Sequence, residues 1–279
     1  MSLSLLALTA ALIGCGGEEP KTQQTAPSPE AQVPAAPPEQ LKLDELKAAA
    51  QNITLVPSPM EMQKALEQAG VQAQLEKAVQ RRTMKMDVTD TDVIAVRTGV
   101  VLADALLTVK TAPPDQLVER LKLVKDGMQK LRAGNDIQTT IDELIGSVQN
   151  VGSGSRDKLV QDLDEMHGAI IPELEYEAGP QVVPLIQAGS WLEGSNLLAG
   201  AILDAKKPEV GNDMLRQPLI ADYFLKYVQL EGRAKAPDEV VKQLNATLLK
   251  LKEISSKPSL VEADVKEIKA QTDTVLSML

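Results

Sequence analysis

Two charged side chains interrupt the most apolar segment of the sequence. Between residues 93 and 109 the only ionisable residues are Arg97 and Asp104, seven positions apart. In a helix this spacing puts both on one face, but about 10.5 Å apart along the axis and too far for a direct ion pair. Because a buried charge needs a partner, each is expected to meet an opposite charge from another helix or to face a wet cavity. A structural ion-pair network is the simpler interpretation, and a ligand site is the alternative.

The five aromatic residues all fall within one stretch of 52 residues. They are Tyr176, Trp191, Tyr223, Phe224 and Tyr227. Flat apolar rings with polar tips could line a small-molecule pocket, whereas ordinary core packing is the commoner use of such side chains. Tyr223 and Tyr227 share a helical face.

Glu193 lies inside the glycine- and serine-rich segment 187–201, on the same helical face as Ile186 and Leu197. This placement predicts a partly buried acid. The candidate ligand-binding residues are therefore Arg97, Asp104, Trp191, Glu193, Tyr223 and Tyr227.

A second candidate chemistry is metal binding. Met84 and Met86 stand two positions apart, and the only histidine, His167, follows Met166. Thioethers and imidazole suit copper. Methionine fills gaps in protein cores far more often, so Met84, Met86 and His167 are weak metal candidates, and we expect no cofactor.

Covalent catalysis has few residues to work with in this chain. One cysteine and one histidine leave little choice of nucleophile and base, and the glycine-rich run 152–158 lacks a preceding strand and the full phosphate-loop pattern. The formal charge of −10, without a run of five basic residues, argues against nucleic acid as a partner. The expected protein is thus not an enzyme, and its partners are a membrane, a small ligand or another envelope protein.

The elements that must position these residues are helices. Apolar side chains recur at steps of three and four over 117–131, 137–151, 241–251 and 261–279, the spacing of one helical face. Capping boxes are expected at Ser58 and at Ser259. With short breaks between segments, residues 41–279 are predicted to form one all-α domain, an irregular antiparallel bundle of roughly nine to eleven helices. A subdomain hinge is expected near 152–155.

The segment before Cys15 is apolar over about 12 residues, too short to span a bilayer. It has the length and small residues of a secretory signal. Leu12-Ile13-Gly14-Cys15 resembles the lipobox of bacterial lipoproteins, which implies cleavage after residue 14 and lipidation of Cys15. Because Gly16 stands where an aspartate favours inner-membrane retention, the resemblance implies the periplasmic face of the outer membrane. Residues 15–40, rich in proline, are expected to form a disordered tether.

The folded part also resembles a family of uncharacterised helical lipoproteins of the Bacteroidetes type. The segments LVPSPMEMQKALEQAG, GVVLADALL and GSWLEGSNLLAG carry this resemblance. It implies an exported all-helical fold, adds interest to Gly99, Asp104, Trp191 and Glu193, and implies no activity. The first hypothesis is an anchored, non-enzymatic binding module. The alternatives are an envelope scaffold with a purely structural core, and a copper-binding protein or metal-dependent enzyme.

Overall fold

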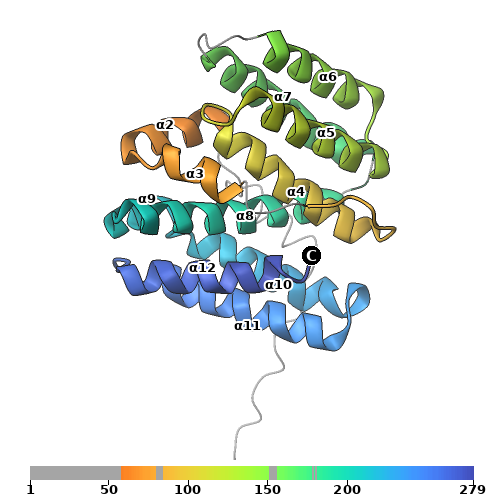
Figure 1. Cartoon of the computed structure of the whole chain (residues 1–279). Coiled ribbons are helices and arrows are strands. Elements are labelled where there is room, and N and C mark those ends of the chain that lie inside the picture. Colours follow the sequence, from red (N-terminus) through yellow and green to blue (C-terminus); the bar gives the residue numbers. More distant parts are fainter. Residues whose placement is uncertain (1–57, 80–83, 151–155, 178, 180) are drawn as a thin grey trace, which may run out of the picture. The chain divides into compact units, whose positions relative to one another are not determined.

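Helices make up the fold, and no strand occurs among the residues that the computed structural model describes, which are 58–79, 84–150, 156–177, 179 and 181–279. This confirms the all-α prediction (Figure 1). The α-helices are α2 (Pro59–Ala69), α3 (Gln72–Val79), α4 (Thr91–Thr108), α5 (Pro114–Lys130), α6 (Asn135–Asn150), α7 (Asp157–Glu177), α8 (Val182–Ala205), α9 (Gly211–Met214), α10 (Pro218–Lys235), α11 (Asp238–Ser255) and α12 (Glu262–Leu276), with a 3₁₀ turn over Pro208–Val210.

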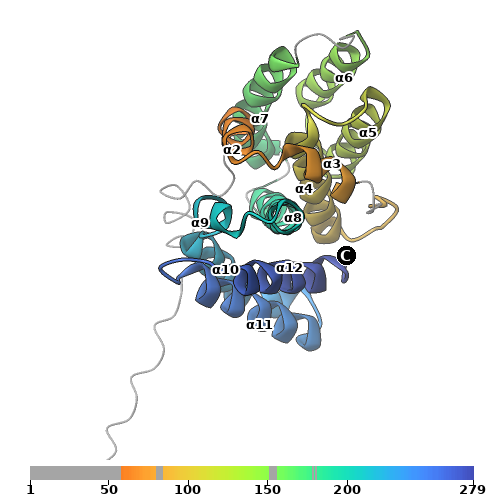
Figure 2. The same ribbon diagram turned by 60° about the vertical axis from the view of Figure 1, so that its left-hand side comes forward.

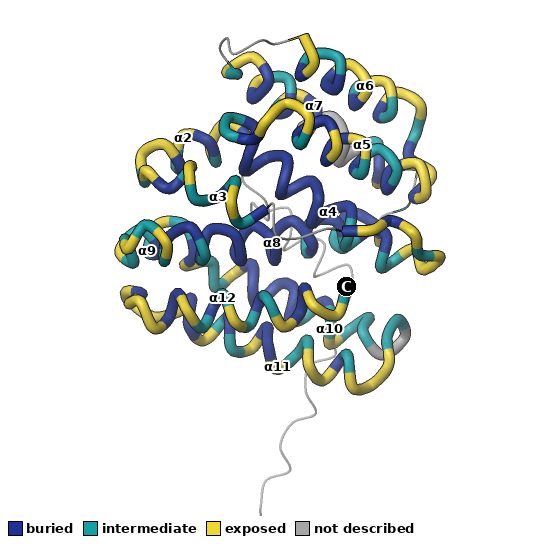
Figure 3. Tube along the Cα trace, viewed as in Figure 1, coloured by how far each residue is buried: buried dark blue, intermediate teal, exposed yellow. Residues whose placement is uncertain are grey.

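The helices α4 and α8 form the centre of the fold. They pack against each other more extensively than any other pair, and α3 contacts both. On one side, α5, α6 and α7 follow α4 in succession; on the other, α12 packs on α8 and α11 links α12 to α10 (Figures 1 and 2). The burial of each helix agrees with this arrangement (Figure 3). The central helices α4 and α8 are buried over most of their length, whereas the outer helices are buried on one face.

Glycines allow the two central helices to approach closely. A Cβ atom on Gly99 of α4 would lie 1.9 Å from the main-chain oxygen of Ile186, and one on Gly189 of α8 would lie 2.0 Å from that of Val96. Ser190 Oγ also donates a hydrogen bond of 2.8 Å to the main-chain oxygen of Gly99. The crossing therefore depends on the absence of side chains at these two positions.

Helix starts agree with the sequence at one of the two predicted capping boxes. Ser58 caps α2, with its hydroxyl accepting from the Glu61 amide and the Glu61 carboxylate accepting from the Ser58 amide. The prediction at Ser259 is wrong, because α12 begins at Glu262 and the Asp264 carboxylate accepts from the Val261 amide at 3.0 Å. The Leu260 amide donates instead to Asn212 Oδ1, and Leu260 lies before the start of the helix.

Several sequence predictions concern other parts of the chain. The signal segment 1–14, Cys15, the tether 15–40 and the hinge 152–155 lie outside the described residues. Among the helices that are described, none is both long enough and apolar enough to cross a bilayer.

Candidate functional site

An apolar pocket of about 210 Å³ lies where α4, α8, α10, α11 and α12 meet. Each of the five helices contributes to its wall, and most of the lining is aliphatic or aromatic. The aliphatic part includes Val96, Leu185, Leu192, Val228, Leu248 and Val275. A concave, mainly apolar site with a few polar groups is the usual form of a small-molecule site.

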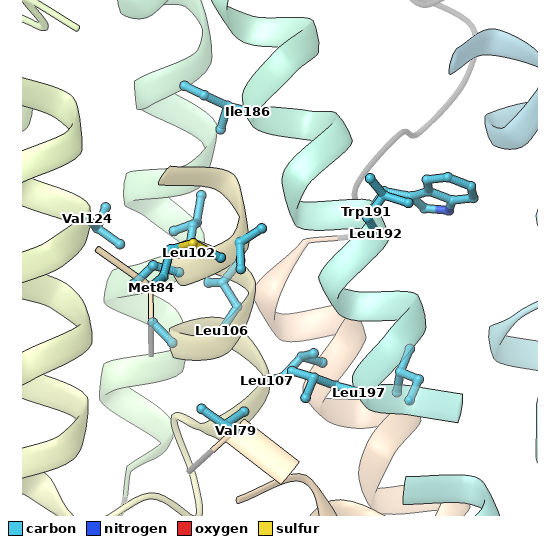
Figure 4. Close-up of a cluster of buried hydrophobic side chains, with 14 of the residues drawn as sticks. Val79, Met84, Leu102, Leu106, Leu107, Val124, Ile186, Trp191, Leu192 and Leu197 are labelled. Atoms are coloured by element: carbon cyan, nitrogen blue, oxygen red, sulfur yellow. The ribbon is translucent and has the colours of Figure 1, made fainter. Parts of the chain in front are cut away.

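Aromatic rings form one wall of this pocket. Trp191 of α8 and Phe224 of α10 stack with centroids 5.4 Å apart, and Tyr227 lines the pocket one helical turn further along α10. The Trp191 indole donates from Nε1 to Gln217 Oε1 at 2.8 Å, which fixes the orientation of its ring. In Figure 4 the Trp191 side chain projects away from the core cluster around Met84 and Leu102. It therefore belongs to the pocket side of α8.

Tyr223, the other predicted tyrosine, packs behind this wall. Its ring meets Phe224 edge-on, with centroids 5.1 Å apart, and it is not among the residues that line the pocket. Burial raises the pKa of its hydroxyl. Tyr223 thus supports the aromatic wall from the core.

Among the described residues, three charged side chains interrupt the apolar lining. Lys235 Nζ pairs with Asp92 Oδ2 at 2.9 Å, joining the end of α10 to the start of α4. Asp90 Oδ1 accepts hydrogen bonds from the amides of Asp92 and Val93 at 2.9 and 3.0 Å and so caps α4. A carboxylate at a helix N-terminus is favourable for the helix, so Asp90 serves the fold as well as the pocket edge.

Tyr227 provides a polar group on the pocket wall. Tyr227 is only 7 % exposed. Burial raises the pKa of Tyr227, and the negative charges of Asp92 and Glu231 raise it further. The phenol therefore stays neutral and lies in a negative electrostatic environment.

Arg97 lies next to the pocket without lining it. Its Nη1 donates to the main-chain oxygen of Lys85 at 2.8 Å, and its Nη2 donates to the main-chain oxygen of Leu279, which does line the pocket. The sequence led us to expect an opposite charge or a wet cavity around this guanidinium. Two distant segments supply its acceptors: the main-chain oxygen of Lys85 and an oxygen of Leu279, the last residue of the printed sequence.

Asp104 lies in a separate cluster of buried charge. It is 5 % exposed and Arg120 of α5 is 9 % exposed. Burial lowers the pKa of Arg120, and the Asp104 carboxylate acts against this shift, followed by Glu119 and Glu76. The charge of Asp104 thus acts on a cation of another helix, and Asp104 is not among the described residues that line the apolar pocket.

The remaining candidates are core residues where they are described. Glu193 is fully buried at 0 % exposure, more than the sequence indicated, and it is absent from the pocket lining. Met84 and Met86 are buried in the hydrophobic core (Figure 4 shows Met84). The side chain of His167 is outside the described part. Within the described part, no three His, Cys, Asp or Glu side chains are grouped so that they could hold a metal ion.

The structure thus brings together only some of the predicted residues. Trp191 and Tyr227 line the pocket and Arg97 adjoins it, whereas Asp104 and Glu193 lie elsewhere. Sequence reasoning missed Asp92 and Lys235, which are 143 positions apart. The only local signal was the position of Asp92 at the start of a helix, and that signal indicates a cap, not a pocket.

Comparison of the chain with protein-family models, with curated proteins and with solved structures found no match. The geometry of the pocket therefore carries the functional argument.

Proposed function

We propose that this chain is a membrane-anchored, non-enzymatic binding protein of the bacterial envelope, and that the pocket between α4, α8 and α10–α12 receives the apolar part of a small ligand. The observation that carries the proposal is the pocket itself, which is walled by aliphatic side chains and by the rings of Trp191, Phe224 and Tyr227. An apolar cavity of about 150 Å³ holds a benzene molecule. A pocket of about 210 Å³ accordingly has room for a single ring or a short alkyl chain.

The polar groups of the lining support binding over catalysis. Asp92 is paired with Lys235, and Asp90 accepts two main-chain amides of α4. Among the described residues of the lining, neither carboxylate stands beside a serine, cysteine or histidine. Groups engaged in this way fix the edge of a site and orient a ligand.

The anchoring half of the proposal rests on Cys15 and its lipobox. Cells supplied with an alkyne-labelled palmitate are expected to transfer the label to the wild-type chain and not to the Cys15→Ser variant. Labelled protein is detected in a gel after coupling to a fluorophore. Ser28→Ala, a change in the segment after the lipobox, is the matched control and should be labelled like the wild type. An unlabelled wild-type chain would show that the lipoprotein interpretation is wrong.

The binding half is tested by filling the pocket. Ala188 lines the pocket from α8 and is only partly buried, so Ala188→Phe places a ring in the space that a ligand would occupy. We expect this variant to bind n-octanol at least about tenfold more weakly than its parent, the loss expected when roughly 1.4 kcal/mol of apolar contact is removed. Because Trp191 is the only tryptophan in the chain and lines the pocket, its fluorescence reports binding directly.

The same substitution at an exposed position of α11, Ala246→Phe, is the control. Both proteins are prepared as the full-length chain with Cys15→Ser, so that no detergent competes for the pocket, and the thermal unfolding midpoint shows whether each is folded. Equal octanol affinity of the two folded variants would contradict the pocket as the binding site. A parent chain that binds no octanol would favour the envelope scaffold with a purely structural core.

A further inference from the structure

The charged groups of the pocket lining are gathered where the start of α4 meets the end of α10. Two of them, Asp90 and Asp92, are acids, and one, Lys235, is a base. Among the described side chains of the lining there is thus one more negative than positive formal charge. Arg97, a further cation near the pocket, donates to oxygens of Lys85 and Leu279 and is not among the described lining residues.

The aromatic wall next to these charges also favours a cation over an anion. Tyr227 lines this wall and is only 7 % exposed. Its pKa is raised by burial and then by the charges of Asp92 and Glu231, so its oxygen remains neutral and can accept a hydrogen bond. Aromatic faces also attract cations through the ring quadrupole, and Trp191 and Phe224 lie on the same wall.

Asp92 already binds a cation of the protein. Lys235 Nζ lies 2.9 Å from Asp92 Oδ2, and both side chains are partly exposed, at 24 and 32 %. A ligand cation entering here would exchange with the Lys235 ammonium, which can turn to solvent on its flexible stem. A ligand carboxylate would have to draw Lys235 away from Asp92 and would then face the carboxylate that Lys235 had left.

We propose that the pocket selects small apolar amines over acids and alcohols, with the apolar body against the wall of Trp191 and Phe224 and the protonated nitrogen between Asp92 and Tyr227. This inference rests on the proposed function, because it assigns a chemical class to the ligand of the same pocket. Lys235 then acts as a built-in competitor that limits the affinity for the amine.

Three probes with one tail and different head groups test the inference: n-octylamine, n-octanol and n-octanoate. Each is titrated at pH 7 into the full-length chain with Cys15→Ser, with Trp191 fluorescence as the readout. We expect octylamine to bind tightest and octanoate weakest. Lys235→Met should strengthen octylamine binding about two- to fivefold, and Asp92→Asn should weaken it by a similar factor while leaving octanol binding unchanged.

A matched control removes the general effect of an acidic protein on a cationic probe. Asp142 of α6 forms an ion pair with Lys125 of α5, outside the pocket lining. The substitution Asp142→Asn therefore changes the net charge by the same amount as Asp92→Asn. It should leave octylamine binding unchanged. Equal weakening of octylamine binding by both substitutions would overturn the preference for amines. So would an affinity for octanoate or octanol that equals or exceeds that for octylamine. In either case, octanol binding would still support the pocket as a binding site. Failure of all three probes to bind would instead refute the proposed function.

Discussion

Replacing Gly99 by alanine is expected to lower the free energy of unfolding by about 3 kcal/mol. The added Cβ would lie 1.9 Å from the main-chain oxygen of Ile186 and 2.9 Å from the amide nitrogen of Ser190. Both are backbone atoms of α8, so no side chain can turn away to make room, and the two central helices must move apart. Such a movement would also break the hydrogen bond that Ser190 donates to the Gly99 oxygen.

The control for this prediction lies in α8 itself. A Cβ on Gly194 would meet no atom within 4 Å, so Gly194→Ala should raise the free energy of unfolding by about 0.5–1 kcal/mol, since alanine loses less backbone entropy than glycine in a helix. Urea unfolding followed by circular dichroism at 222 nm measures both variants. Loss of the same stability by Gly99→Ala and Gly194→Ala would show that helix composition matters and the close crossing does not.

Replacing Asp104 by leucine is expected to cost about 3 kcal/mol of stability, because it removes the negative charge that acts most strongly on the buried Arg120. The reason is that Arg120 stays buried, at 9 % exposure, after losing the charge that most supports its protonated form. Urea unfolding gives the free energy. This expected loss is much larger than that for Asp142→Asn, which breaks the exposed pair with Lys125 and should change stability by less than about 0.5 kcal/mol.

The double variant Asp104→Leu/Arg120→Met distinguishes an ion pair from two independent residues. Removing both charges leaves no uncompensated ion, so most of the lost stability should return. If instead the double variant is as unstable as the sum of the two single variants, Asp104 and Arg120 do not act on each other. Recovery of stability in the double variant would account for Asp104 in the apolar helix α4 by its effect on folding.

The candidate residues show how far their types alone could lead. Trp191 and Tyr227 were singled out because they combine apolar rings with polar tips, and they do line a pocket. Asp104 and Glu193 were singled out because an acid in an apolar helix needs an explanation, and their explanation lies in the core, away from that pocket. Residue type thus predicts that a side chain is buried, and only its direction on the helix decides what it meets.

Arg97 shows that residue types also do not predict which atoms a side chain will bind. Arg97 donates to the main-chain oxygen of Lys85, and a sequence gives every residue such an oxygen without marking any of them. The Ser259 capping box failed for a related reason, because a side chain from a distant segment, Asn212, takes the Leu260 amide. At the capping box, a contact with a distant segment replaces the hydrogen bond that the local pattern predicts.

The spacing of apolar residues is sufficient to predict the helical fold class and the buried faces of the outer helices over 117–131, 137–151, 241–251 and 261–279. These depend on spacings of three and four residues and on caps, which act within one or two turns of the chain. The crossing of α4 and α8 at two glycines, and the pocket of five helices whose edge joins Asp92 to Lys235, become visible only in the folded arrangement. The physical reason is that an amphipathic face requires burial against some apolar surface but does not specify which one. The choice is made by the fit of all the helices at once.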